Sequence, residues 1–170
     1  IRTCLNLLGV LSNPAGVSKQ LIGVWHPSLL EPMAEAVALL GTEFTWIVYG
    51  GDGLDEVTLT NETFVAEVSG KKIRKFKLSP EDFGIQRAEI EHLKIEKPEQ
   101  SAKIIREILE SKRRDEARSL VVLNAAAALI VGGIAKQPIQ AARLAEQSID
   151  SGSALTKLER LIQTTNKNKI

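Results

Sequence analysis

Three glycines and three carboxylates stand together in the segment GGDGLDE, residues 50–56, directly after an apolar stretch that predicts a buried strand. In open α/β sheets ligands gather at the carboxyl ends of strands, so this position suits a binding site. The neighbouring carboxylates of Asp55 and Glu56 offer hard oxygen ligands to a magnesium ion that substrate phosphates also hold. Taken alone, the segment is even more typical of an acidic surface turn, which is the simpler interpretation.

A second candidate is the segment GVLSNPAG, residues 9–16, between the first apolar segment and the first predicted strand. Its glycines and the Asn13-Pro14 pair are typical of a sharply shaped loop that could form the wall of a pocket. An ordinary connection between two elements is the alternative.

The remaining polar residues indicate no further chemistry. His26 and His92 have no other metal-binding residue at ligand spacing, and the basic run KKIRKFK, residues 71–77, is typical of a solvated hairpin. The net charge of +1 argues against a general nucleic-acid or membrane binder. The single cysteine, Cys4, rules out an intramolecular disulfide and favours a reducing compartment, the cytoplasm. The apolar run 120–134 is too short to span a membrane.

Two short apolar runs rich in branched side chains, residues 20–25 and 44–49, predict buried strands. Leu29, Leu30, Met33, Val37 and Leu40 recur between them at helical spacing, with Ser28 as the expected cap. A strand, a helix and a strand in this order favour parallel pairing through a right-handed crossover.

After residue 56 the pattern predicts strands at 57–59, 63–68 and 73–78, paired as an antiparallel meander. Helices are expected at 98–109, 120–131 and from 138 to 149, and after Gly152. The fold class is therefore α/β: a mixed sheet, mainly parallel with an antiparallel meander, flanked by helices.

Six blocks of the sequence resemble those of anthranilate phosphoribosyltransferases, in order and with matching spacing. RTCLNLLGVLSNPA is similar to the family's RTIFNLLGPLTNPA. The match continues through QLIGVWHPSLLEPMAEAVALLG, GGDGLDEVTLT, LSPEDFGI, LNAAAALIVGG and SGSALTKLERL.

The resemblance implies transfer of a phosphoribosyl group from phosphoribosyl pyrophosphate to anthranilate, in tryptophan biosynthesis. It assigns Asp55 and Glu56 as magnesium ligands and places Gly9 and Val10 beside the anthranilate pocket. Residues 1–164 are then the C-terminal part of the α/β catalytic domain, of the type shared with nucleoside phosphorylases, and residues 165–170 a frayed tail. We expect the helical N-terminal domain, which would form a homodimer, and the glycine-rich donor-binding segment to lie outside this chain, leaving it inactive alone.

Some residues depart from the family's pattern. Val10 stands where the family has proline, Gly51 replaces a common glutamate, and Cys4 and Leu5 replace an Ile-Phe pair. Two alternatives stay open: an enzyme like the pyrimidine nucleoside phosphorylases, and a non-catalytic homologue that binds nucleic acid.

Overall fold

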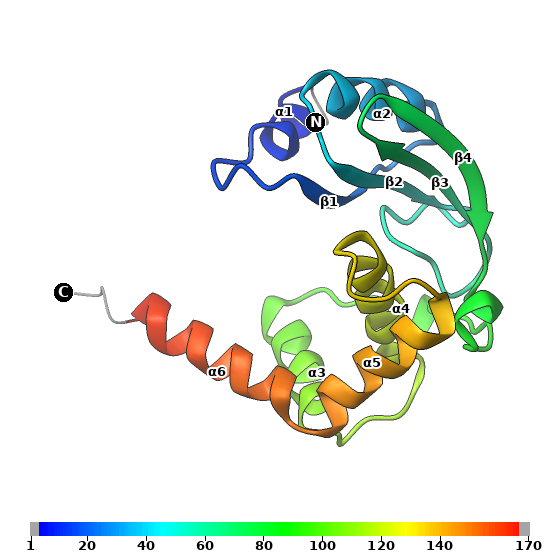
Figure 1. Ribbon diagram of the computed structural model, residues 1–170. Coiled ribbons are helices and arrows are strands. Elements are labelled where there is room, and N and C mark those ends of the chain that lie inside the picture. Colours follow the sequence, from blue (N-terminus) through cyan, green and yellow to red (C-terminus); the bar gives the residue numbers. More distant parts are fainter. Residues whose placement is uncertain (1–3, 167–170) are drawn as a thin grey trace.

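A mixed four-stranded sheet separates two layers of helices in the computed structural model, which describes residues 4–166 (Figure 1). The strands follow one another across the sheet in chain order. The first pair is parallel, whereas the second and third are antiparallel. The expected α/β class and the meander are confirmed, although parallel pairing is confined to one strand pair of the described sheet. The strands are β1 (Lys19–Gly23), β2 (Phe44–Gly50), β3 (Thr63–Ser69) and β4 (Lys72–Leu78).

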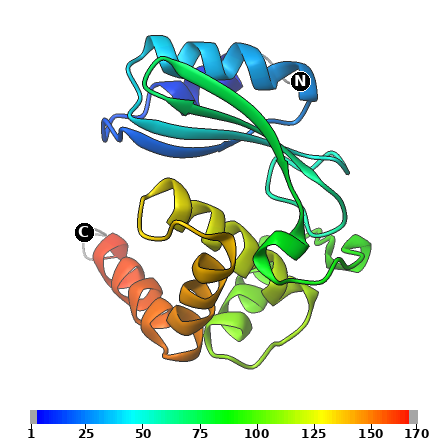
Figure 2. The same cartoon turned by 45° about the vertical axis from the view of Figure 1, so that its right-hand side comes forward.

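The helices cover the two faces of the sheet unequally (Figures 1 and 2). One face carries α1 (Cys4–Leu11) and α2 (Leu30–Leu39), and α2 contacts β2 and β3. The other face carries the larger helical layer, in which α4 contacts β1 and β2. Its members are α3 (Pro98–Leu109), α4 (Glu116–Val131), α5 (Pro138–Asp150) and α6 (Ser153–Asn166). Helix α6 extends two residues into the segment expected to be frayed; residues 167–170 lie outside the described residues.

Strand β2 is buried on both faces, which explains its almost continuous apolar sequence. Trp46 and Val48 belong to the core cluster that α4 and α5 complete. Ile47, between them, belongs to the cluster on the α2 side, together with Met33 and Val37. This alternation follows from the two-residue period of a strand, so each helical layer packs on its own set of β2 side chains.

Two local predictions were wrong. Ser28 does not cap α2; instead the ring Nδ1 of His26 accepts a hydrogen bond from the Ser28 backbone N–H and caps a 3-10 turn over Pro27–Leu29. Residues 57–59 do not form a strand. The backbone N–H groups of Val57 and Thr58 donate to side-chain oxygens rather than to a neighbouring strand, so no ladder forms.

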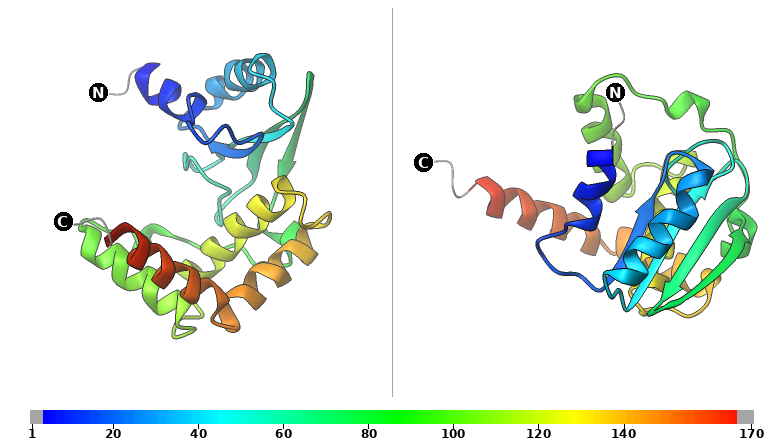
Figure 3. Two further views of the ribbon diagram at one scale, coloured as in Figure 1. Left: turned by 60° about the vertical axis from the view of Figure 1, so that its left-hand side comes forward. Right: turned by 90° about the horizontal axis from the view of Figure 1, so that it is seen from above.

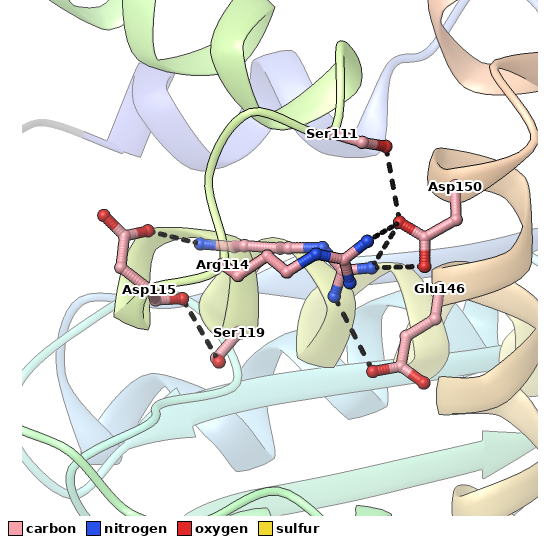
Figure 4. Close-up of polar contacts among 7 residues, drawn as sticks. Ser111, Arg114, Asp115, Ser119, Glu146 and Asp150 are labelled. Atoms are coloured by element: carbon pink, nitrogen blue, oxygen red, sulfur yellow. Dashed lines mark hydrogen bonds and ion pairs between the residues drawn. The ribbon is translucent and has the colours of Figure 1, made fainter.

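A network of ion pairs fastens the start of α4 to the end of α5 (Figure 4). The guanidinium of Arg118, whose residue is 7% exposed, donates to both carboxylate oxygens of Asp150 at 3.0 Å. Arg114 reaches the same carboxylate at 3.3 Å. In the linker just before α4, Arg113 pairs with Asp115, the N-cap residue of α4. Asp150 at the end of α5 thus binds one arginine of this linker and one of α4.

Candidate functional site

The acidic loop, residues 51–62, leaves the end of β2 and returns at the start of β3. Because β1 and β2 are parallel, both of their carboxyl ends meet at this edge of the sheet. The loop descends from the sheet toward α4 in Figures 1 and 2. Its Val57 and Leu59 are buried in the core on the α4 side. The glycine-rich segment therefore lies at the sheet edge that the sequence predicted.

Asp52 organises the loop rather than facing a ligand. One carboxylate oxygen accepts from the Leu54 backbone N–H at 3.2 Å, and the other accepts from the hydroxyls of Thr58 and Thr60. Partial burial acts to raise the pKa of Asp52, but these hydrogen bonds outweigh it and hold the pKa below its usual value. A Cβ at Gly50 would lie 2.6 Å from this carboxylate, so a larger residue there would displace the Asp52 side chain. The Asp52 side chain therefore stabilises the conformation of the loop through hydrogen bonds within it.

Asp55 and Glu56 present exposed side chains at the turn of the loop. Neither carboxylate has a hydrogen bond or ion pair to any residue within 4–166 that the structure describes. Desolvation by neighbouring atoms, and then the charge of Asp55, raise the pKa of Glu56. Two unpaired, mutually repelling carboxylates fit a divalent cation, whose charge would relieve the repulsion.

The composition of the acidic site limits which cation it could hold. No group of three or more potential metal-ligating side chains is found among the described residues. Magnesium commonly takes one or two protein carboxylates together with substrate phosphates, and the pair fits that mode.

Two contacts fix the backbone on either side of Glu56. A Cβ built on Gly23, the last residue of β1, would lie 1.6 Å from the carbonyl oxygen of Asp55, so glycine lets the loop pack directly on the strand. On the other side, the Asn124 amide of α4 bonds the Val57 backbone N–H and C=O, both at 2.9 Å. Neither residue was among the site residues predicted from the sequence.

Gly9 and Val10 lie in the last turn of α1, which runs to Leu11, and not in a loop as predicted. Both are exposed and line an open cavity of about 390 Å³ with Pro14 and Leu21. The residues lining this cavity do not include the acidic pair. Helix α1 packs on the α2 side of the sheet, whereas the acidic loop packs on the α4 side (Figure 3). The described residues do not bring the two candidate sites into one pocket.

Most of the other charged residues considered in the sequence analysis form ion pairs within the chain. In the basic run, Arg74 pairs with Glu67, Lys75 pairs with Glu31, and Lys77 pairs with Glu62. His92 lies on the surface, 3.5 Å from Glu116. Among the helices of residues 4–166, none has the length and apolar character needed to cross a bilayer.

Comparison with known proteins gives consistent matches. Residues 1–155 match the family described as "Glycosyl transferase family, a/b domain". An anthranilate phosphoribosyltransferase of Parvibaculum lavamentivorans is 47% identical over all of this chain and 50% of its own length. The enzyme of that name from Saccharomyces cerevisiae, solved with PRPP and Mg, superposes with a TM-score of 0.87 at 30% identity, over 98% of this chain and 48% of that one. The enzyme from Thermus thermophilus superposes with a TM-score of 0.84 at 38% identity, over 94% of this chain and 47% of that one. The chain thus spans about half the length of the relatives it matches.

Proposed function

The chain belongs to the glycosyl transferase family defined by this α/β domain, and from that premise we propose that the complete protein is an anthranilate phosphoribosyltransferase. It would transfer the 5-phosphoribosyl group of phosphoribosyl pyrophosphate to the amino group of anthranilate and release pyrophosphate. The observation that carries the proposal is the pair of unpartnered carboxylates, Asp55 and Glu56, held on a fixed backbone at the carboxyl ends of two parallel strands.

The acidic pair would serve the donor side of the reaction. Asp55 and Glu56 would hold Mg²⁺, which, when bound, supplies positive charge beside the leaving pyrophosphate. The other residues of this chain hold the two carboxylates in position. Gly23 and Asn124 keep the acidic pair in place before substrate arrives, so little rearrangement is needed when the donor binds.

The end of α1 would serve the acceptor side. A Cβ at Gly9 would meet no atom within 4 Å, so open space adjoins this residue, as the wall of a small-molecule pocket requires. Val10 is 41% exposed and presents a branched apolar side chain next to it. We assign both residues to anthranilate binding. A proline at position 10, as in the family pattern, would disturb the last turn of α1, because proline removes a helical N–H and clashes with the preceding turn.

The remaining parts of the assignment stay predictions. The complete protein is expected to be a cytoplasmic homodimer that joins through a helical domain outside this chain. The chain by itself, residues 1–164 with its short tail, is expected to have no transferase activity, because the family resemblance implies a donor-binding glycine-rich segment that is not among these residues. Strong turnover by the isolated chain would contradict this expectation.

The assignment is tested by measuring phosphoribosylanthranilate formed by the full-length enzyme. The double variant Asp55→Asn, Glu56→Gln should lose most activity at limiting magnesium. A matched variant, Glu35→Gln with Glu89→Gln, removes two exposed carboxylates elsewhere and should retain it. If the wild-type enzyme makes no product, the function is wrong; if the acidic-pair variant equals its control, the role of the two carboxylates is wrong.

Two other functions are less well supported. Phosphorolysis of thymidine without anthranilate turnover would indicate a pyrimidine nucleoside phosphorylase, but the relatives described above are anthranilate phosphoribosyltransferases. Nucleic-acid binding would need unneutralised cations. Three cations of the basic run, residues 71–77, are instead paired with glutamates. A salt-sensitive shift of oligonucleotide mobility would favour this last function.

A further inference from the structure

Asn124 is the polar residue that most needs an explanation in the helical layer. It lies in the middle of α4, between the fully buried Leu123 and Ala126, and the other residues of the helix from Leu120 to Val131 are all apolar. Asparagine is a poor helix former, and its amide is costly to bury unless it is hydrogen-bonded. A residue of this kind in a core helix is expected to have a specific partner.

The partner of Asn124 is the backbone of the acidic loop. The amide oxygen accepts from the Val57 N–H at 2.9 Å, and the amide nitrogen donates to the Val57 C=O at 2.9 Å and to the Leu120 C=O at 3.1 Å. Both donors and the acceptor of the amide are thus used. Val57 is 1% exposed, so its peptide is shielded from solvent while the Asn124 side chain is in place.

The geometry of the peptide unit connects this contact to Glu56. The Val57 N–H belongs to the planar peptide that begins at the Glu56 Cα, so holding this N–H fixes one of the two planes that meet there. The preceding plane contains the Asp55 carbonyl, which packs on Gly23. With both planes held, the direction of the Glu56 Cα–Cβ bond, and so the point from which its side chain extends, is set from α4 on one side and from β1 on the other.

We propose that Asn124 is a positioning residue for the magnesium-binding carboxylates, acting through the Val57 backbone without touching metal or substrate. The proposal rests on the proposed function of Asp55 and Glu56. It makes α4 part of the active-site framework. The ion pairs of Arg118 and Asp150 hold the same helix less than two turns earlier, so the helical layer as a whole supports the acidic loop.

The test compares Asn124→Ala and the more space-filling Asn124→Leu with Val131→Ala in the full-length enzyme. Val131 is buried in the same helix, two turns away, so Val131→Ala removes packing from α4 without removing a side-chain hydrogen bond to the loop. The Asn124 variants should raise the magnesium concentration for half-maximal rate about 10- to 100-fold, as expected when support of a metal ligand is lost. They should largely recover kcat at saturating magnesium, whereas Val131→Ala should show no such shift.

Hydrogen exchange gives a second reading that does not depend on activity. The Val57 amide should exchange at least about tenfold faster in both Asn124 variants than in Val131→Ala, while amides of α5 stay equally protected. Equal magnesium shifts in all three variants, or a Val57 amide as protected as in wild type, would overturn the proposal. If the wild-type enzyme makes no product, the proposed function fails, and the exchange result still decides whether Asn124 holds the loop.

Discussion

Replacing Gly23 by alanine tests how closely catalysis depends on the position of the acidic loop. The added methyl carbon would lie 1.6 Å from the Asp55 carbonyl oxygen and 2.5 Å from its carbon. Ordinary contact begins near 3.4 Å, so strand and loop must separate by roughly 2 Å in a close-packed region. A misplacement of about 1 Å in an active site can cost about 100-fold in rate. We therefore expect kcat/KM to fall at least about 100-fold, near 2.7 kcal/mol of transition-state stabilisation.

The same substitution should leave the protein folded. Overpacking of this kind costs about 1–3 kcal/mol, within a typical unfolding free energy of about 5–15 kcal/mol. Steady-state kinetics of the full-length enzyme should be measured alongside urea unfolding. Gly132→Ala is the matched control, because Gly132 has φ −67° at the end of α4 and an added Cβ would come no nearer than 3.2 Å to any atom.

The result that would refute the reasoning is a folded Gly23→Ala enzyme within about threefold of wild-type kcat/KM, since a misplacement of the expected size costs far more. Such an enzyme would show that the position of Asp55 and Glu56 relative to β1 does not matter. A loss shared equally by Gly132→Ala would show that the effect is not specific to the acidic loop.

Four further outcomes are expected. Because the pKa of Glu56 is raised, its charge destabilises the fold as pH rises above 4.5. In magnesium-free buffer at pH 7, Glu56→Gln should therefore raise the melting temperature, and an unchanged or lower melting temperature would contradict this. Asp52 has a lowered pKa, so its contribution to the stability of the fold is present above pH 3.8 and lost at more acid pH. Asp52→Asn should therefore destabilise the loop at neutral pH, measured as faster amide hydrogen exchange of residues 53–60. Asp150→Asn leaves the buried Arg118 with a weaker partner and should lower the urea midpoint of unfolding at pH 7. The Arg118 hydrogen bond depresses the pKa of Asp150, so the difference in midpoint from wild type should shrink below pH 3.8. Val10→Pro should change the KM for anthranilate much more than the KM for the ribosyl donor, and equal changes in both would argue against a place beside the acceptor.

The parts of the fold that the sequence predicted are those with local signals. The apolar run FTWIVY became β2, and the prolines at 98 and 138 each begin a helix at the predicted residue. These signals are local because strand alternation and proline's fixed φ act within a few residues. The acidic pair could be proposed for the same reason, since glycines and adjacent carboxylates after a buried strand are visible in the sequence.

The parts that could not be predicted depend on residues far apart in the chain. Residues 57–59 have the composition of a strand, but the partner of Val57 is the side chain of Asn124, 67 positions later. Gly23 gives no local sign that the Asp55 carbonyl packs against it. Both contacts arise only once α4 and β1 are assembled around the loop, which is why the residues that support the acidic pair could not be predicted.

The direct test of the central claim is calorimetric binding of phosphoribosyl pyrophosphate to the full-length enzyme at fixed magnesium. Neutralising Asp55 and Glu56 together should weaken donor binding about 10- to 100-fold. The variant that neutralises Glu35 and Glu89 should bind as wild type. Equal donor affinity in all three proteins, with the same dependence on magnesium, would show that this pair of carboxylates does not hold the metal.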